Sequence, residues 1–376
     1  MRLLAALLLM WLTACGQPQG VRFHEDADPA DLAEWGVVVR DGKQLRLAEG
    51  MIPYELATPL FTDHASKLRA IWLPKGTQAA YNPTGPLDFP VGTIIAKTFY
   101  YPRDAQGREI AAHGPAELSG PGLGGNAMDV SRIRLLETRL LVRRKSGWVA
   151  LPYIWNQDGT EARLKRIGGV VKLNLAPTAH ETGGDFAYVI PSMTQCGACH
   201  VPDAATKALA PIGPTARSLD IASPFLASHP NQLRMLADSG QLTGLPAKPV
   251  VANAVWTDTA QSLDARARAY LDVNCGHCHS ATGPARTSGL HLDAATPLSH
   301  DLGLCKPPVA AGQGTGDRLF DIVPGRPEQS ILVYRMQSVK PNEMMPEIGR
   351  TTAHAEGIAL ISSWIAAMKG QCSSER

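Results

Sequence analysis

Two short cysteine–histidine motifs carry the side chains of this sequence that are best suited to chemistry. The pattern Cys-x-x-Cys-His occurs at residues 196–200 and again at residues 275–279. Two thiols three positions apart lie on one helical turn, where they add across the two vinyl groups of a haem, and the next residue brings an imidazole to the iron as proximal ligand. The pattern therefore predicts two covalently bound c-type haems, held by Cys196, Cys199 and His200 and by Cys275, Cys278 and His279.

Zinc binding and thioredoxin-like dithiol chemistry are the competing interpretations of these motifs. A structural zinc ion requires four closing ligands, and neither motif has a second Cys/His pair at zinc-finger spacing. A thioredoxin-type pair needs no histidine directly after its second cysteine, and no alternating strand–helix–strand pattern surrounds either motif. Haem attachment explains all three reactive positions of each motif, and it is the interpretation that we favour.

The length and charge of the chain limit the classes of function that it serves. With 376 residues the chain is long enough for two or three domains. Its 36 basic and 34 acidic residues give a formal net charge of +2. A nearly neutral chain of this kind argues against a nucleic-acid partner and against strong electrostatic attraction to a membrane.

The first 15 residues have the character of a targeting segment. Arg2 supplies a positive charge, and Leu3 to Leu12 form an apolar stretch too short to span a bilayer as a mature helix. The segment ends in Leu12-Thr13-Ala14-Cys15, which resembles the lipobox of bacterial lipoproteins. An ordinary signal peptide that happens to contain a cysteine is the alternative.

The lipobox resemblance implies a lipid anchor and a cellular location. Cleavage before Cys15 would leave that cysteine to carry the lipid, and residues 16–30 would form a tether. In lipoproteins, an Asp after the lipidated cysteine retains the protein at the inner membrane, and this chain has Gly16 there. The resemblance therefore implies attachment to the periplasmic face of a bacterial membrane, with the outer membrane as the expected one.

The cysteine count is consistent with export. One lipidated and four haem-bound cysteines leave Cys305 and Cys372 out of seven. Because the periplasm is oxidising, we expect these two to form a disulfide, with two unrelated buried thiols as the alternative. The bond would tie the end of the chain to the second motif's domain.

Residues 31–188 are predicted to form a β-rich domain. Short β-prone runs are separated by turn residues, such as Asn156-Gln157-Asp158-Gly159, a pattern typical of an antiparallel sandwich or barrel. Glu137 and Arg139 share one face of a predicted strand, and a solvated or cross-strand-paired face is favoured over a functional site. The predicted strands are Leu68–Leu73, Thr93–Tyr101, Arg139–Arg144, Trp148–Trp155 and Phe186–Ile190.

Residues 189–250 form the predicted first haem-binding segment. A strand leads through Pro191 directly into the first motif, so we expect this haem at the seam between the β-rich domain and the helical part. Met235, on an expected helix with Leu233 and Leu236, is the candidate distal ligand, although a Met among leucines is more often a core residue. The alternatives are an empty sixth position or a ligand drawn from His229, Met193, His64 and His180.

Residues 251–376 are predicted to form a helical domain around the second motif. Ser262 has the character of an N-cap, and Leu263, Ala267, Tyr270 and Leu271 then form an amphipathic stripe that runs into Cys275. A helix followed directly by Cys-x-x-Cys-His resembles the class I cytochrome c fold. That resemblance implies that His277, inside the motif, points away from the iron.

A methionine–proline loop and a last helix extend this resemblance. In Glu343-Met344-Met345-Pro346-Glu347-Ile348-Gly349, the order Met-Pro-x-x-Gly resembles the distal-ligand loop of class I cytochromes, which favours Met345 over Met344 as the second haem's distal ligand. Ile358, Ile361, Trp364, Ile365 and Met368 then lie on one face of a helix. In the family, such a C-terminal helix packs across the helix that precedes the motif.

The fold that we expect is therefore α+β and multidomain, with a β-rich N-terminal domain followed by helical cytochrome c-like haem domains. Some bacterial periplasmic proteins pair a β-rich module with c-type haem domains, and Phe89–Thr93, Glu137–Arg139 and Tyr153–Asn156 resemble parts of that module.

An anchored dihaem cytochrome would transfer electrons between redox partner proteins, such as a periplasmic dehydrogenase and another cytochrome or an oxidase. A dihaem peroxidase with an open distal site on the first haem is the alternative. A β-domain that binds a partner or ligand, and that the haems only serve, is a third possibility.

Overall fold

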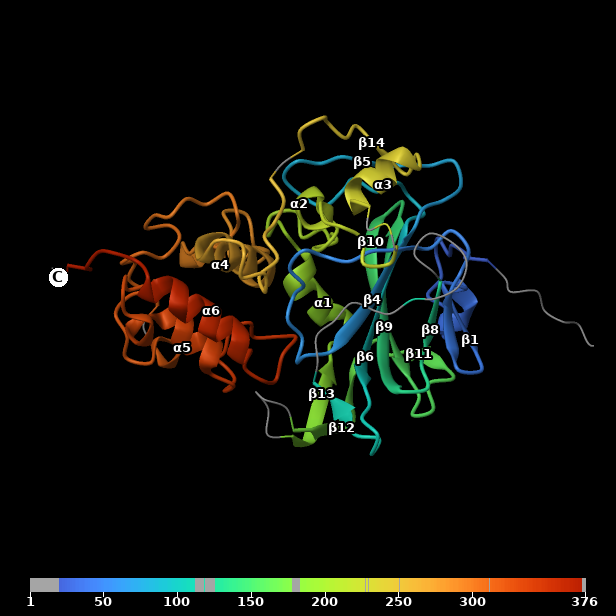
Figure 1. Ribbon diagram of the computed structural model, residues 1–376, viewed down its shortest axis with the longest axis horizontal. Coiled ribbons are helices and arrows are strands. Elements are labelled where there is room, and N and C mark those ends of the chain that lie inside the picture. The colour runs from blue at the N-terminus through green and yellow to red at the C-terminus, as the bar shows by residue number, and fades with distance from the viewer. Residues whose placement is uncertain are drawn as a thin grey trace, which may run out of the picture.

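The structure is a computed structural model that describes residues 20–111, 118, 126–177, 183–226, 228, 230–249, 251–310 and 312–373. Two lobes lie side by side in Figure 1, a β-rich lobe formed by the residues up to 249 and a helical lobe formed by those from 251 onward. The chain ends at the far side of the helical lobe. The expected mixed α+β fold with a β-rich N-terminal region is confirmed.

The described strands form four sheets. The largest has six strands in the order β11-β10-β9-β6-β4-β3, all of them antiparallel to their neighbours. Three smaller sheets have the orders β1-β2-β8, β13-β12-β7 and β14-β5. The strands are β1 (Val38–Asp41), β2 (Gln44–Leu47), β3 (Ile52–Pro53), β4 (Ser66–Trp72), β5 (Ala79–Ala80), β6 (Ile94–Pro102), β7 (Glu109–Ile110), β8 (Ala127–Asp129), β9 (Ile133–Arg144), β10 (Gly147–Trp155), β11 (Ala162–Leu164), β12 (Gly169–Ala176), β13 (Gly184–Ile190) and β14 (Leu242–Thr243).

Helices occur mainly in the second half of the described chain. A 3₁₀-helical turn, η1, precedes the first strand, and the remaining helices follow β13. They are η1 (Leu32–Trp35), α1 (Met193–His200), α2 (Ala216–Leu219), α3 (Gln232–Asp238), α4 (Leu263–Leu271), η2 (Asp272–Gly276), η3 (Arg286–Ser288), η4 (Gln313–Thr315), η5 (Pro327–Gln329), α5 (Ile331–Gln337) and α6 (Ala355–Ala366).

The two faces of the large sheet are covered differently. On one face, alternate apolar residues such as Leu68, Ile94 and Leu140 pack against the β1-β2-β8 sheet and form the largest core. The other face has two separate apolar ends. Ile71 and Ile95 pack under α2 and α3 at one end, and Phe99 and its neighbours pack under β12 and β13 at the other.

The helical lobe forms around the pair α4 and α6. Ser262 is the N-cap of α4 as predicted, because its hydroxyl accepts a hydrogen bond from the Ala265 amide at 3.1 Å. The predicted stripe of α4 is buried against α6, whose Ile361 and Trp364 are buried in the same core. The chain then continues through η2, a short π-helical stretch that contains Cys275.

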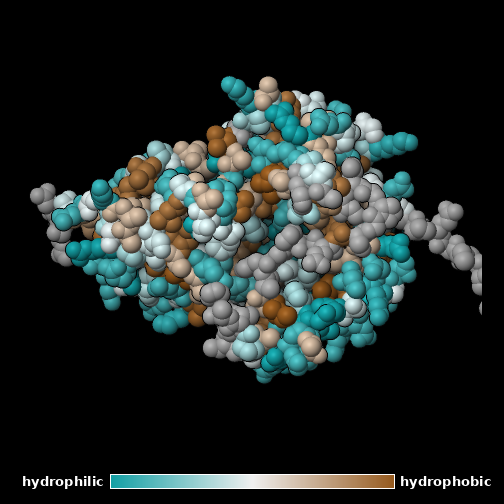
Figure 2. All heavy atoms as spheres, viewed as in Figure 1, coloured by the Kyte–Doolittle hydropathy of each residue, from teal (hydrophilic) through white to brown (hydrophobic). Residues whose placement is uncertain are grey.

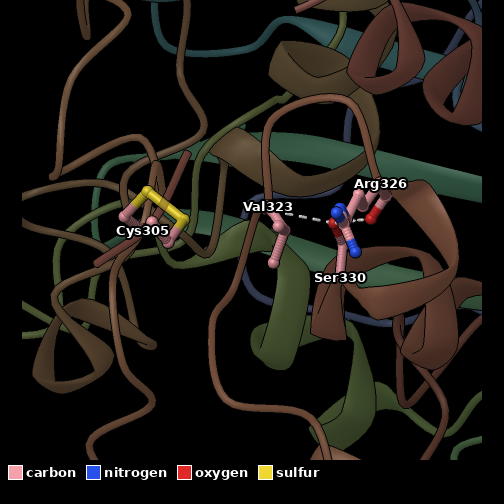
Figure 3. Close-up of a disulfide and its surroundings, with 5 residues drawn as sticks. Cys305, Val323, Arg326 and Ser330 are labelled. Atoms are coloured by element: carbon pink, nitrogen blue, oxygen red, sulfur yellow. Dashed lines mark hydrogen bonds between the residues drawn. A yellow bond between two sulfur atoms is a disulfide. The ribbon is translucent and has the colours of Figure 1, made fainter. Parts of the chain in front are cut away.

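The end of the chain is fixed to the helical lobe by the expected disulfide between Cys305 and Cys372 (Figure 3). The two Cα atoms are 5.2 Å apart, and the bond closes a separation of 67 residues. In the same part of the lobe, the Ser330 hydroxyl accepts a hydrogen bond from the Val323 amide and donates one to the Arg326 carbonyl, which holds the turn before α5.

Hydrophobic side chains at the surface belong to no single element. Figure 2 shows them at several places over the helical lobe and near the middle of the face in view. None of the helices in the described part of the chain combines the length and apolar character that a membrane-spanning segment requires. The exposed large hydrophobic residues are Val91, Ile167, Val170, Val189, Val251, Leu298, Val309, Leu319 and Val339.

Candidate functional site

The second motif opens onto a cavity of about 850 Å³ in the helical lobe. Cys275, Cys278 and His279 line it from η2 and the turn that follows. Met345 lines it as well, from the loop between α5 and α6, whereas Met344 does not appear among the lining residues. Residues about 70 positions apart in the sequence therefore line one cavity, and the role of Met345 as a ligand stays a prediction.

His279 is held as a neutral imidazole with one nitrogen free. Burial lowers the pKa of His279 to about 4. Its Nδ1 lies 3.4 Å from the Ser288 hydroxyl, which already donates its proton to the Ala285 carbonyl at 2.7 Å. The Nδ1–H must therefore donate to Ser288, which leaves the Nε2 lone pair available to a metal.

Arg350 fixes the loop that presents Met345. Arg350 is 5% exposed, and its guanidinium donates to the carbonyls of Met345 at 2.8 Å, Ser338 at 2.9 Å and Thr352 at 2.9 Å. The Met345 amide in turn donates to the Arg335 carbonyl at 2.9 Å. The Met345–Pro346 peptide bond is cis. With both of its backbone groups bonded, Met345 has little freedom to leave the cavity.

The β-rich lobe also holds this loop. The Asp63 carboxylate, between β3 and β4, accepts hydrogen bonds from the amides and hydroxyls of Thr351 and Thr352 at 2.8–3.1 Å. Nearby, the His354 ring stacks on Phe61 with ring centroids 4.1 Å apart. Contacts between residues almost 300 positions apart thus position the Met345 loop.

The first motif forms α1, which follows β13 directly. Ser192 caps the helix through a reciprocal pair of bonds with Gln195, at 3.2 Å and 2.9 Å. His200 Nδ1 lies 2.8 Å from the Ala210 carbonyl, which only accepts, so Nδ1 carries the proton and Nε2 is free. Burial and the charge of Lys97 lower the pKa of His200 to about 4. His200 and His279 are therefore alike in protonation, and each makes its hydrogen bond through Nδ1.

The two motifs touch each other. The Cys278 thiol donates to the Ala198 carbonyl at 3.3 Å, and Thr282 binds the Pro202 carbonyl through its hydroxyl and the Ala204 amide through its carbonyl. Hydrogen bonds from Cys278 and His277 lower the pKa of the Cys199 thiol. His277 thus lies at the junction of the motifs, where Ala198 and Cys199 also line the large cavity. Figure 1 shows α1 between the sheet and the helical lobe.

A set of charged side chains lies on the sheet face near α1. We call it the charged belt. Burial and the charges of Arg139 and Arg69 lower the pKa of Lys97 to about 7, and burial lowers the pKa of Lys67 well below its ordinary value. The members of the charged belt are Glu55, Lys67, Arg69, Lys97, Glu137 and Arg139.

The favoured interpretation of Glu137 and Arg139 as a solvated or cross-strand-paired face is wrong. Glu137 is fully buried, and Arg139 donates to both of its oxygens at 2.7 Å and 2.6 Å within the same strand. The residues are buried because β12, β13 and α1 cover this part of the sheet, which a reading of one strand does not reveal.

The other candidate ligands lie elsewhere or outside the described residues. Met235 is half-buried on α3, whose neighbours include α2 and β14. Met193 is at the start of α1, where its sulfur accepts from Arg166 at 3.7 Å. His64 packs edge-on to Phe61 in the junction between the lobes. Cys15, His180 and His229 lie outside the described residues.

Several residues of the site were not identified from the sequence. Lys67, Arg69 and Lys97 lie in strands that are otherwise apolar, and this repeated charge at alternate positions was the available clue. Asp63 had no such clue because its role depends on a contact between the lobes, and Arg350 had none because its role depends on how the Met345 loop folds.

The residues present fit a covalently attached haem at each motif. Each motif offers two free thiols and a neutral histidine with Nε2 available, and the cavity of the second adds a thioether. No group of three or more His, Cys, Asp or Glu side chains within the described ranges is arranged to hold a metal ion. A haem iron takes four ligands from its porphyrin, so it needs no such group.

Comparison with known proteins gives no relative: no family model, curated protein or solved structure matches this chain.

Proposed function

We propose that this chain is a dihaem c-type cytochrome that transfers electrons between redox partner proteins. The observation that carries the proposal is the contact between the two motifs, in which the Cys278 thiol lies 3.3 Å from the Ala198 carbonyl. A haem supplies one-electron chemistry when it is bound. Because electron tunnelling falls steeply with distance, attachment sites in contact are arranged for transfer from one cofactor to the next.

The second motif has the ligand set of an electron carrier rather than of a catalyst. Nε2 of His279 and the sulfur of Met345 would be the protein ligands of the iron. With both bound, no site would be left for a substrate, and a thioether ligand would raise the reduction potential. Hydrogen bonds of Arg350 and Asp63 hold the Met345 loop, so the sulfur is already in position at the cavity. Rigid ligands of this kind suit rapid electron transfer.

The domain architecture and the cellular location are part of the same proposal. We infer a sandwich-like β domain followed by a class I cytochrome c-like domain over residues 251–376, supported by the packing of α4 on α6 and by the Met345 loop. The lipobox at Cys15 and the Cys305–Cys372 disulfide support a lipid anchor in an oxidising compartment, facing the periplasm. The expected partners are a periplasmic dehydrogenase and another cytochrome or an oxidase.

The test is the mass and absorption spectrum of the mature protein, purified from a host that attaches c-type haem. We expect the mass of two haems that acidified acetone does not remove. Replacement of Cys196 and Cys199 by Ala, and separately of Cys275 and Cys278, should each leave one haem. A mature chain without the added mass of porphyrin would contradict the proposal. Zinc binding or dithiol chemistry would then be the favoured interpretation of the motifs.

A dihaem peroxidase is the second candidate, and one observation favours it. Met235, the thioether expected at the first iron, lies on α3, which packs against α2 and β14, whereas α1 with the first motif packs against β10. An open distal position at the first iron would admit peroxide. Spin-state measurement on each haem, followed by addition of peroxide to the half-reduced protein, separates the two functions. Two low-spin haems and no peroxide turnover exclude the enzyme.

A further inference from the structure

The charged belt aligns like charges across neighbouring strands. Arg69 on β4 lies directly opposite Lys97 on β6, and Lys97 lies directly opposite Arg139 on β9. Lys67 is two residues away on the same face of β4. Like charges directly opposite each other in a sheet are destabilising, so this arrangement calls for a compensating anion.

The carboxylates of the protein only partly provide that compensation. Glu55 pairs with Arg69, and Glu137 pairs with Arg139. Lys67 donates to the Leu60 carbonyl at 3.0 Å. Lys97 makes no hydrogen bond or ion pair with a residue that the structure describes, and its ammonium lies 5.0 Å from the centre of the Phe99 ring. Among the residues that the structure describes, the two lysines of the charged belt therefore have no carboxylate partner.

The charged belt faces the first motif. The charges of Arg139 and Glu137 act on the Cys196 thiol, and that of Lys97 acts on both Cys199 and His200. Apolar cores cover both ends of this sheet face, and α1 packs against the same sheet through β10. An anion that neutralised the charged belt would lie beside whatever the first motif holds.

We propose that the charged belt is a carboxylate-binding site that serves the first motif, with Lys97 as its unpaired cation. The inference rests on the proposed function, because a haem attached at Cys196 and Cys199 carries two propionate groups. A propionate would supply the negative charge that Lys97 lacks among the residues that the structure describes. A small soluble carboxylate bound beside that haem is the other source of the same chemistry.

The test uses the full-length protein with both haems and the variant Lys97→Met, which keeps the length of the side chain and removes its charge. The midpoint potential of each haem is measured from pH 5 to pH 8, with and without acetate as the probe. Lys43→Met, on the exposed β1–β2 turn, is the matched control. Lys97→Arg restores the charge, and unchanged haem content and circular dichroism establish folding.

If the propionates are the ligand, Lys97→Met makes the first haem about tenfold harder to reduce, a shift of about 59 mV for one electron. Its potential also becomes dependent on pH, without any effect of acetate. If a soluble carboxylate is the ligand, acetate shifts the wild-type potential to a saturating value and has no effect on Lys97→Met. In both cases Lys97→Arg and Lys43→Met behave as the wild type.

Two outcomes overturn the inference while leaving the proposed function intact. In the first, two haems are present and Lys97→Met changes neither the potential nor its response to pH and acetate. In the second, Lys97→Met converts the first haem from low spin to high spin, which would identify Lys97 as an iron ligand rather than a carboxylate partner. A protein without haem instead removes the proposed function itself.

Discussion

At the scale of single residues, the choice between two adjacent methionines can be tested directly. Met345 lines the cavity of the second motif and Met344 does not. We expect Met345→Ala to remove the sulfur-to-iron absorption band and to lower the potential of one haem by roughly 0.2 V, within the span of about 0.8 V that axial ligands control. Met344→Ala is the control and should leave both unchanged. Equal effects of the two changes would exclude Met345 as the particular ligand.

A partly buried carboxyl beside the second motif gives a pH prediction. Burial raises the pKa of Asp272, against the opposing effects of the Ala294 amide at 2.8 Å and of Arg217. A carboxyl whose pKa is raised by folding contributes its full stability below the unfolded value of about 3.9. That contribution is lost as the pH rises through the folded pKa.

We therefore expect Asp272→Asn to become more stable relative to the wild type as the pH rises from 4 to 7. The measurement is the free energy of unfolding by denaturant at each pH. Asp26→Asn, on an exposed segment, controls for a general effect of charge. A difference between Asp272→Asn and the wild type that stays constant over this range would contradict the assignment.

At the scale of elements, local sequence patterns predicted the helices and strands better than the contacts between them. The five predicted strands overlap β4, β6, β9, β10 and β13, because alternation and turn residues are local signals, although β9 begins at Ile133, six residues before the predicted start. The Ser262 cap and the stripe of α4 are equally local. The charged belt is different, because the alignment of Arg69, Lys97 and Arg139 depends on strand register, which no single stretch of sequence specifies.

The loop of Asp63 shows the same limit and carries its own prediction. Asp63 has a φ of 47°, a conformation that Asn also tolerates, so Asp63→Asn removes charge without adding backbone strain. Because hydrogen bonds to a charged acceptor contribute about 1.5–3 kcal/mol, we expect a loss of about 2 kcal/mol of stability and weaker Met345 ligation. Thermal unfolding and the sulfur-to-iron band measure these effects. Asp129→Asn, at an exposed turn, should change neither.

At the scale of the whole molecule, the disulfide fixes the end of the chain beyond α6 to the loop at Cys305. It closes 67 residues that include the Met345 loop and α6. The chain-entropy model assigns such a loop about 4 kcal/mol. We expect the double variant Cys305→Ala/Cys372→Ala to lose about that much stability in denaturant titrations, with haem content unchanged. Unchanged stability would mean that the helical lobe constrains its own terminus without the bond.

The contact between the motifs leads to a prediction about electron flow. The Cys278–Ala198 and Thr282–Pro202 bonds join the motifs directly, so transfer between the two haems should occur within one molecule. After rapid one-electron photoreduction of the purified protein, we expect the electron to redistribute between the haems at a rate that does not change with protein concentration.

The matched control for that experiment is the variant in which Ala replaces Cys196 and Cys199, which should keep only the second haem and lose the redistribution phase. An intramolecular relay requires both attachment sites in one chain, whereas transfer between molecules requires only collisions. A redistribution rate proportional to protein concentration would therefore show that the haems exchange electrons between chains. In that event the contact between the motifs would serve the folded structure rather than electron transfer. The role of the charged belt could still be tested on the first haem alone.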